Sequence, residues 1–363
     1  MIKDYSYLID VYKENLKDNE NFLNTRSIHW DNFYKGNDKF FNLENLINFR
    51  KDQILSKGLD DAMNLQNRLD LIESLNHFDN KFLRKNLPKS NVGNCKYSIN
   101  YLGYYFDYGI IHHLKWFEKI ENFIQDNDQV LEIGGGFGSL ARIIILNKNL
   151  KYFLVDLPEA NLMSNYYLQK HFPEKRIFNY LDFKNLNIED EMSNFDIFIL
   201  PPNCLNEKNI KYNFIINARS FMEMNMKTIK NYFELIHNKM ELNGYFLNIN
   251  RYLKYSVGED IKIEDYPYDN YWETKISEKS FLQKHIHFIL TKRVNQNGNI
   301  HDELLRLKKN NLDMKNKKLD NFNNLKNLMK HLVYRLVRKV FKLFFSKKLL
   351  KKISKVIYNF SEN

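Results

Sequence analysis

The nine residues from 130 to 138, Val-Leu-Glu-Ile-Gly-Gly-Gly-Phe-Gly, constrain the fold of this chain more than any other stretch. The apolar half, which ends at Ile133, predicts a short buried strand, and three glycines then provide backbone that a ligand can approach closely: Gly134, Gly136 and Gly138. The apolar spacing of the next eight residues predicts a helix packed on a sheet. A strand, a glycine-rich turn and a helix in this order predict a nucleotide-like site in an α/β fold.

The spacing of the glycines narrows the choice of ligand. A dinucleotide fingerprint needs G-x-G-x-x-G, and counting from Gly134 and Gly136 the third position is Ser139. The motif present is E-x-G-x-G-x-G, with Glu132 just before the turn. An anion at that position repels a pyrophosphate but attracts the ammonium group of an amino-acid tail. The pattern therefore disfavours a dinucleotide.

Two acids follow at the ends of the next predicted strands. Residues 151–155 form an apolar strand that leads to Asp156, whose carboxylate can accept hydrogen bonds from both ribose hydroxyls. Residues 176–183 are predicted as a third strand that ends at Asp182 and Phe183, suited to the edge and face of an adenine. Both acids point to a nucleoside.

A fourth strand is predicted at 194–200. It ends at Pro201 and Pro202, because proline cannot donate the hydrogen bonds of a strand ladder. Four apolar strands in this order, with helical spacing between them, predict a doubly wound, mostly parallel sheet.

These motifs resemble those of the class I methyltransferases that use S-adenosylmethionine (SAM). The resemblance covers roughly residues 100 to 295 and implies a Rossmann-like fold with SAM as the cofactor. Glu132 and the glycines match the first motif, Asp156 the second, and Asp182 the acid that faces adenine. The resemblance places these cofactor-binding residues at the site: Glu132, Gly134, Gly136, Gly138, Asp156, Leu157, Asp182, Phe183 and Pro201.

Three strings resemble a narrower group, the bacterial sugar O-methyltransferase family. They are residues 131–142, the Val-Asp-Leu-Pro-Glu at 155–159, and the Asn-Ala-Arg-Ser-Phe-Met-Glu-Met-Asn at 217–225. This likeness implies methyl transfer to a sugar hydroxyl of a surface polysaccharide or its precursor. Several sugar O-methyltransferases use Mg²⁺, which leaves a metal-assisted reaction open. No group of Asp, Glu and His at ligand spacing calls for a metal.

Methyl transfer to a hydroxyl needs a positioned base, because a sugar hydroxyl ionises far above neutral pH. Glu223 is the first candidate, as a base or a substrate anchor at the start of a helix expected to run through Leu235. The alternative is an acid in the first turn of the helix that is favoured there by the helix dipole. His112 and His113 are further candidates, since histidine titrates in the useful range. Adjacent helical residues point in different directions, so at most one of the two is expected at the site.

Other functions are weaker matches. Residues 200–203 differ at both ends from the D-P-P-Y motif of amino-methyltransferases, since Leu200 and Asn203 stand where Asp and Tyr are needed. Another small molecule or a nitrogen acceptor remains an alternative, as does a non-catalytic module of a glycan-assembly complex. A nicotinamide oxidoreductase is disfavoured by the glycine spacing.

The charged residues are unevenly distributed along the chain. Residues 301–363 hold 17 Lys and Arg against 5 Asp and Glu, while residues 1–300 hold 38 against 39. A neutral body gives nucleic-acid phosphates no broad surface, so no nucleic-acid partner is expected. The tail has apolar residues at helical spacing with cations opposite over 329–356, which suits an anionic membrane surface or packing on the body itself.

Four segments are expected: residues 1–95 as a helical cap or lid, 96–295 as the SAM-binding domain, 296–328 as a polar linker or weak helix, and 329–363 as the basic amphipathic tail. Cys95 and Cys204 stand far apart, outside any metal or disulfide motif. Without a recognisable secretory signal, a cytoplasmic location is expected, with the tail reaching the inner face of the membrane.

Overall fold

The computed structural model describes residues 5–18, 41–51, 71–205, 209–255, 258–281, 283 and 285–317. The chain divides into one unit that ends at Leu307 and a second that begins at Lys308. Every described strand belongs to the first unit. The predicted tail, residues 329–363, lies outside the described residues.

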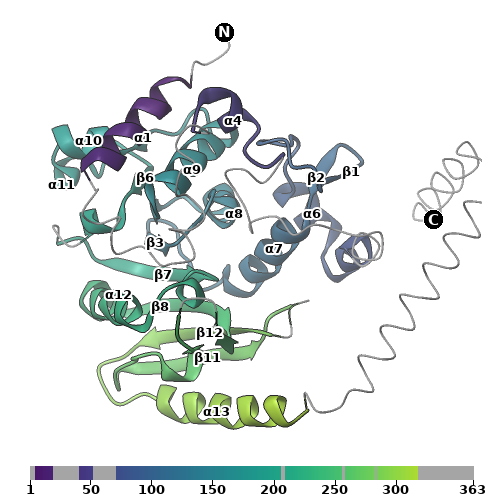
Figure 1. Ribbon diagram of the computed structural model, residues 1–363, viewed down its shortest axis with the longest axis vertical. Helices are drawn as coiled ribbons and strands as arrows, with labels where there is room; N and C mark the ends of the chain where they lie inside the picture. The colour runs from purple at the N-terminus through teal and green to yellow at the C-terminus, as the bar shows by residue number, and fades with distance from the viewer. Residues whose placement is uncertain are drawn as a thin grey trace, which may run out of the picture. The chain divides into compact units, whose positions relative to one another are not determined.

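An eight-stranded sheet forms the centre of the first unit (Figure 1). In spatial order its strands are β11 (Trp272–Lys279), β12 (Ile286–Arg293), β8 (Met240–Arg251), β7 (Tyr212–Ala218), β3 (Gln129–Ile133), β4 (Lys151–Val155), β6 (Ile197–Leu200) and β5 (Ile177–Phe178). Strand β12 is antiparallel to both of its neighbours, and the other pairings are parallel.

The sheet is wound in two directions from β3. The chain passes from β3 through α8 (Ser139–Asn147) to β4 on one side, and from β7 through α12 (Met226–Lys239) to β8 on the other. Because parallel crossovers are right-handed, these helices cover opposite faces of the sheet. Strands buried on both faces need continuous apolar runs. β4 and β6 have them, and in β3 the run is interrupted by the buried Glu132. The predicted Rossmann-like α/β fold is confirmed.

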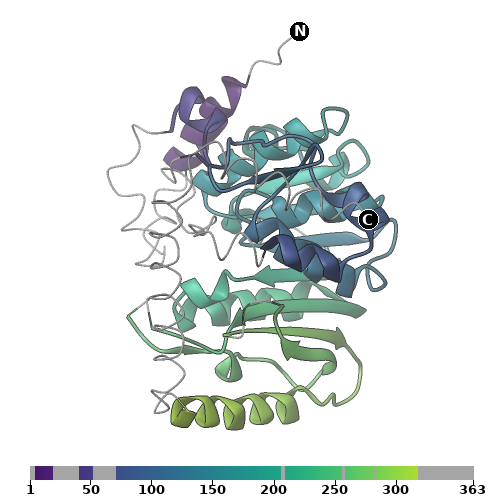
Figure 2. The same cartoon turned by 90° about the vertical axis from the view of Figure 1, so that its right-hand side faces the viewer.

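The remaining elements surround this sheet (Figure 2). The other helices are α1 (Tyr7–Asp18), α4 (Leu43–Ile47), α6 (Asn80–Asn86), α7 (Tyr108–Ile120), α9 (Pro158–His171), α10 (Tyr180–Asn185), α11 (Ile188–Glu191) and α13 (Ile300–Lys317). Short 3₁₀ turns are η2 (Leu75–His77), η3 (Pro202–Leu205), η4 (Phe221–Glu223) and η5 (Ile263–Asp265). Two small antiparallel pairs are β1 (Ile99–Tyr101) with β2 (Tyr104–Phe106) and β9 (Leu253–Lys254) with β10 (Ile261–Lys262).

The predicted third strand over 176–183 is wrong beyond Phe178. Only β5 is extended there, and it pairs with β6 at the outer edge of the sheet. Helix α10 follows because Asn179 and Asp182 form a capping box: the Asn179 side chain accepts from two backbone N–H groups, and Asp182 accepts from the Asn179 N–H at 2.8 Å. Strand β6, and not β5, pairs with β4.

Two further boundaries differ from the prediction. Strand β7 lies between the predicted fourth strand and the segment that holds Glu223. The helix expected to begin at Glu223 begins at Met226, because the Asn225 side chain caps it by accepting from the Thr228 N–H at 2.8 Å. Glu223 lies before this helix, in the short turn η4.

The described part of the segment at 1–95 is helical where it is regular. Helix α1 packs on α9 and α10, and the Tyr180 hydroxyl donates to Asp18 at 3.2 Å. Just after α4, Arg50 is 2% exposed and pairs with Asp107 at 2.7 Å. Its guanidinium also lies 4.6 Å from the ring centre of Phe137, within the glycine-rich turn. The early segment is thus tied to the central sheet.

The first residues of α13 lie next to edge strand β11. The α13 residues Ile300, Leu304 and Leu307 are buried. Within the segment at 296–328, expected as a polar linker or a weak helix, residues 300–317 are helical. Edge strand β11 has a register shift between Thr274 and Ile276. The Thr274 N–H donates to the Asn299 side chain at 2.7 Å, and the Ser277 hydroxyl bonds to Glu303 of α13.

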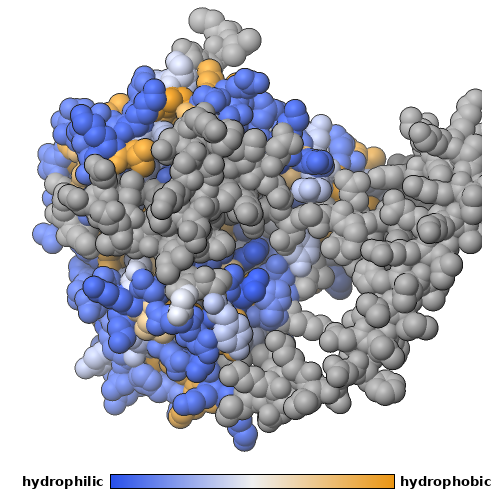
Figure 3. Space-filling view, viewed as in Figure 1, coloured by the Kyte–Doolittle hydropathy of each residue, from blue (hydrophilic) through white to orange (hydrophobic). Residues whose placement is uncertain are grey.

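The described surface shown in Figure 3 is mostly hydrophilic, with hydrophobic residues in small separate areas. Among the helices of the described ranges, none has the length and hydrophobicity to span a bilayer.

The buried Arg50 and Asp107 pair gives a first prediction. Replacing Arg50 by Met leaves the Asp107 carboxylate buried without its cation, which should lower the free energy of unfolding by about 3–5 kcal/mol. The double variant Arg50→Met with Asp107→Asn removes both charges and keeps the side-chain oxygen that accepts from the Ile110 N–H, so it should recover most of that loss. Urea denaturation measures both; equal losses in the single and double variants would contradict the prediction.

Candidate functional site

The carboxyl ends of four neighbouring parallel strands meet at one edge of the sheet. We call the residues there the strand-end cluster: Gly134–Gly138 after β3, Asp156 and Leu157 after β4, Pro201–Asn203 after β6, and Arg219–Glu223 after β7. The chain reverses its winding direction between β3 and β7. Open α/β sheets bind ligands at such a switch point, outside the carboxyl ends of the strands.

The glycine-rich turn depends on residues without side chains. Gly134 has a φ of 75°, and a Cβ there would overlap the side chain of Ser220 from the β7 end. Gly138 has a φ of 84° and occupies the N-cap position of α8. An L-residue is disfavoured at such φ values. The turn and the β7 end therefore approach more closely than side chains would allow.

Asp156 fixes the shape of this turn from the neighbouring strand. One carboxylate oxygen accepts from the Gly136 N–H at 2.7 Å, and the other accepts from the Leu157 N–H at 2.7 Å. Burial raises the pKa of Asp156 to about 6, against the lowering effect of these two hydrogen bonds, and the negative charge of Glu223 adds to the rise. Asp156 thus links the β3 turn, the β4 end and Glu223.

Glu132 lies beneath the turn. Its side chain is buried, accepts a hydrogen bond from the Tyr152 hydroxyl at 2.7 Å, and lies next to Gly135. Burial raises the pKa of Glu132 to about 8, opposed by the Tyr152 hydrogen bond and aided by the charge of Asp156. Glu132 is therefore largely protonated at neutral pH. Glu132, Asp156 and Glu223 together favour a positively charged ligand, which would stabilise their ionised forms.

A buried asparagine network holds Glu223 in place. Asn217 donates to the Ile133 carbonyl at 3.0 Å and accepts from the Phe221 N–H at 3.0 Å. Asn250 donates to Asn217 at 2.9 Å and accepts from the Met222 N–H at 3.0 Å. These bonds join the ends of β3, β7 and β8 to the turn that carries Glu223, and a satisfied buried network of this kind specifies one geometry.

The two histidines have different surroundings on α7. His112 is buried; its Nδ1 lies 2.7 Å from the Tyr108 carbonyl and its ring packs on Tyr108. His113 is closer to the cluster, since its Nδ1 lies 2.9 Å from the hydroxyl of Ser139 at the start of α8. Burial, and then the neighbouring His112, lower the pKa of His113 to about 3. His113 is neutral at pH 7 and a weak base.

The β6 end contributes residues from the Pro-Pro segment. Pro201 is buried, and its carbonyl accepts from the Cys204 N–H at 3.1 Å. The side-chain oxygen of Asn203 is buried and, within the ranges that the structure describes, has no hydrogen-bond partner. A buried oxygen in this state costs free energy until it accepts a hydrogen bond.

Asp182 and Phe183 do not follow any of the four strands whose ends form the strand-end cluster. They lie in α10 beyond edge strand β5, where the Asp182 carboxylate is part of the capping box. Phe183 stacks with Tyr180 at 6.5 Å between ring centres. The signal for this outcome was present in the sequence as an Asn-x-x-Asp capping pattern.

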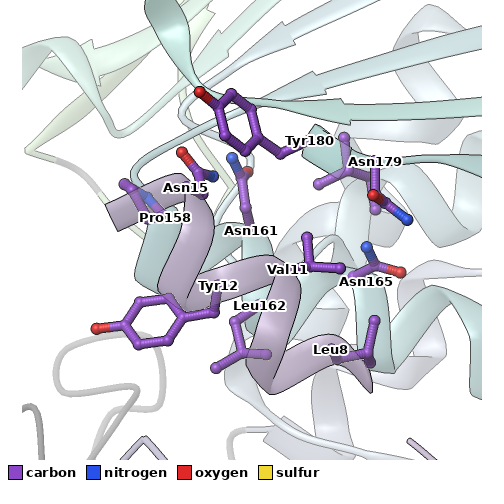
Figure 4. Close-up of a pocket in the computed structure, with 11 residues that line it drawn as sticks. Leu8, Val11, Tyr12, Asn15, Pro158, Asn161, Leu162, Asn165, Asn179 and Tyr180 are labelled. Atoms are coloured by element: carbon purple, nitrogen blue, oxygen red, sulfur yellow. The ribbon is translucent and has the colours of Figure 1, made fainter. Parts of the chain in front are cut away.

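A small pocket lies near this edge but outside the cluster. Residues of α1, α9 and the β5–α10 turn line it, including Asn15, Asn161 and Tyr180 (Figure 4). Its volume of about 10 Å³ fits roughly one water molecule and is far too small for a nucleoside. Within the described part of the chain, no group of three His, Cys, Asp or Glu residues is arranged to hold a metal ion.

Some site residues were not foreseen. Arg50 reaches Phe137 of the turn across a long sequence separation, and no local pattern marks such a contact. Tyr152 stands in β4 two residues before Leu154, which pairs in register with Glu132, so the correct strand alignment would have revealed it. Tyr232 of α12 lies close enough to Asp156 for that charge to raise its pKa, after the larger effect of burial.

Comparison with known proteins finds similarity to methyltransferase structures only at low identity. No protein-family model matches the chain, and no curated protein matches it. Among solved structures, it is similar to the mitomycin 7-O-methyltransferase MmcR (12% identity, TM-score 0.34, 46% of this chain and 49% of that one). It is also similar to the pyocyanin biosynthetic protein PhzM (11%, 0.33, 49% and 54%) and to Methanocaldococcus jannaschii Trm5 in complex with adenosine (13%, 0.35, 56% and 53%).

The chain spans about half the length of these three proteins. At such identities the similarity concerns the fold, and a fold of this kind hosts many activities. The chemistry must therefore be argued from the strand-end cluster.

The close approach at Gly134 gives a second prediction, with Gly103 as the matched control. Both have left-handed backbones, at φ values of 75° and 82°, but a Cβ at Gly103 meets nothing within 4 Å. Gly103→Ala should cost about 1–2 kcal/mol of unfolding free energy from backbone strain alone. Gly134→Ala should cost more, because its Cβ also displaces Ser220. Urea denaturation compares the two variants, and equal losses would show that the Ser220 contact has no effect.

Proposed function

We propose that this protein is a SAM-dependent methyltransferase that transfers a methyl group to a sugar hydroxyl. The observation that carries the SAM part is the strand-end cluster: a left-handed glycine turn held by Asp156, with two more carboxyl groups close by. The sugar part is supported by the family-like strings at 131–142, 155–159 and 217–225.

The residues present fit SAM. The compact turn at Gly134–Gly138 gives room for close backbone approach, and the carboxyl groups of Glu132 and Asp156 suit its positive charge. Asp156 is the acid placed for the ribose hydroxyls. Because β6 and not β5 neighbours β4, we assign the adenine amino group to the side-chain oxygen of Asn203, which has no partner among the described residues, in place of Asp182.

When bound, SAM supplies a methyl group on a positively charged sulfur that an acceptor oxygen can displace in line. The protein must hold that oxygen in position and take up its proton. Glu223 is the base in this proposal, since it lies at the switch point on a turn fixed by Asn217 and Asn250. His113, with its pKa near 3, is the weaker base and more suited to packing and hydrogen bonding.

Donor affinity should depend on pH and on the charge of the sulfur. Below pH 6 Asp156 and Glu132 are both mostly protonated, and above pH 8 both are mostly ionised, given pKa values of about 6 and about 8. The affinity for SAM should therefore rise as the pH rises through this window. S-adenosylhomocysteine (SAH) keeps the ammonium group and the ribose but has no positive sulfur, so its affinity should also rise, and by less than that of SAM.

Isothermal titration calorimetry of both ligands at several pH values measures this difference. In the double variant Glu132→Gln with Asp156→Asn, the rise of both affinities through this window should disappear. A wild-type protein whose affinity for SAM stays constant across the window would contradict the assignment of these carboxyl groups to the donor.

Methyl transfer itself is tested with tritiated SAM and an extract of capsular or lipopolysaccharide precursors. Label should appear in the glycan fraction. The variant Glu223→Gln should lower the rate constant kcat by about 100-fold or more, because it removes the proton acceptor, and should leave SAH affinity within about twofold.

Glu234→Gln is the matched control, since Glu234 is an exposed acid on α12 near in sequence. It should keep wild-type activity. Absence of label from every glycan fraction would contradict the sugar acceptor, and full activity of Glu223→Gln would contradict the base.

A further inference from the structure

The hairpin of β1 and β2 ends in an exposed apolar tip. Tyr101 pairs with Tyr104, so Leu102 and Gly103 form a two-residue turn between the strands. The Leu102 side chain is 66% exposed, and a Cβ placed on Gly103 would meet no atom of the described residues within 4 Å. The tip therefore projects away from the described body of the first unit (Figure 1).

Leucine is an unusual residue for this turn. The backbone is left-handed at both turn positions, with φ values of 51° at Leu102 and 82° at Gly103. Such turns usually contain Asn-Gly or Asp-Gly, because the Cβ of a larger residue crowds the left-handed backbone. Leu102 combines this strain with an apolar side chain in water, and neither stabilises the protein alone. Conflicts of this kind with local rules are expected at functional positions.

The base of the hairpin is firmly attached. Phe106, at the end of β2, is fully buried in the core, and the Tyr105 N–H donates to the Pro88 carbonyl at 2.8 Å. At the tip, the Gly103 N–H donates to the Asn100 side chain at 3.3 Å. The tip thus has its shape before it meets a partner, and this N–H needs no water, which matters where water is scarce.

The chain around the hairpin is uniformly basic. Residues 80–106 contain no Asp or Glu. The five cations of this stretch are all exposed: Lys81, Arg84, Lys85, Lys89 and Lys96. Within the ranges that the structure covers, none of them forms an ion pair. Lys89 follows Pro88, whose carbonyl bonds to β2, and Lys96 stands three residues before β1. Positive charge therefore accompanies both strands.

An anionic lipid surface matches this combination. Leucine can enter the boundary of the acyl chains, the half-buried Tyr101 and Tyr104 suit the headgroup level, and lysines are attracted to lipid phosphates. A stable protein interface needs about 800 Å² of matched surface from each partner, which one projecting leucine does not supply. A nucleic acid would attract the cations but gain nothing from Leu102.

We propose that Leu102 at the tip of the β1–β2 hairpin inserts into the headgroup layer of an anionic membrane, where Lys89 and Lys96 contact lipid phosphates. This contact does not depend on the proposed methyl transfer. It is also separate from the basic tail expected at 329–363, so the experiment compares variants of the full chain in which the tail is unchanged.

Co-sedimentation with vesicles of phosphatidylcholine and phosphatidylglycerol tests the proposal, with vesicles of phosphatidylcholine alone as the neutral reference. Leu102→Asn should weaken partitioning onto the anionic vesicles by roughly tenfold, because the burial of one leucine side chain is lost. Asparagine suits the left-handed turn, so the urea midpoint of this variant should equal or exceed that of the wild type. Leu305→Asn is the matched control: Leu305 is 65% exposed on α13, and the variant should bind like the wild type.

Two further variants separate insertion from attraction by charge. Lys89→Gln with Lys96→Gln should weaken partitioning by roughly tenfold or more at low salt, whereas Lys227→Gln with Lys230→Gln, two exposed cations on α12, should have little effect. Leu102→Trp should keep the binding, and its added fluorescence should be quenched by brominated lipid, which reports a side chain at the acyl boundary.

The proposal is overturned if the wild type does not bind anionic vesicles. It is also overturned if Leu102→Asn binds them as the wild type does, which would assign the binding to other residues such as the tail, or if Leu102→Asn and Leu305→Asn lose the same amount. A tip that instead joins two copies of this chain would show self-association, lost in Leu102→Asn, without any effect of that variant on vesicle binding.

Discussion

The hydrogen bond from the Gly136 N–H to the Asp156 carboxylate is the constraint on which the site depends. It joins the turn after β3 to the end of β4 and thereby fixes where the backbone of the turn lies. Ser220 of the β7 end can then approach Gly134, and the asparagine network connects β7 and β8 to the same place. Four strand ends are brought into one arrangement because each is held by a polar contact to the next.

The acidic groups of this arrangement oppose the stability of the ligand-free protein. Burial favours the protonated forms of Glu132 and Asp156, so their raised pKa values describe a site that is costly to ionise without a cation. An apolar side chain in place of Glu132 would avoid this cost, whereas Asp156 also holds the turn through the Gly136 N–H. Functional sites commonly retain such groups at the expense of stability, which agrees with the proposed binding of a cationic donor at these carboxyl groups.

The sequence predicted the fold class because its strongest local signals are also the ones that decide topology: buried apolar strands, each followed by a turn and a helix. It predicted the glycine turn and Asp156 for the same reason. The error at 176–183 arose because a two-residue strand and a capped helix share an apolar pattern with a longer strand, so Asp182 was expected at a strand end and lies in α10 instead. Arg50 reaches Phe137, and Ser220 reaches Gly134, only through tertiary structure, which periodicity does not encode.

Edge strand β11 decides whether another chain can pair with the sheet at this edge. A long open strand is a template on which a second chain can add its own strand, the usual beginning of aggregation. Here the register shift between Thr274 and Ile276 interrupts the regular pairing of β11. The Asn299 side chain accepts a hydrogen bond from the Thr274 N–H, and the Ser277 hydroxyl donates to Glu303. Charged side chains at Glu273 and Lys275 add to the obstruction. The sheet can therefore end in a strand without inviting intermolecular growth.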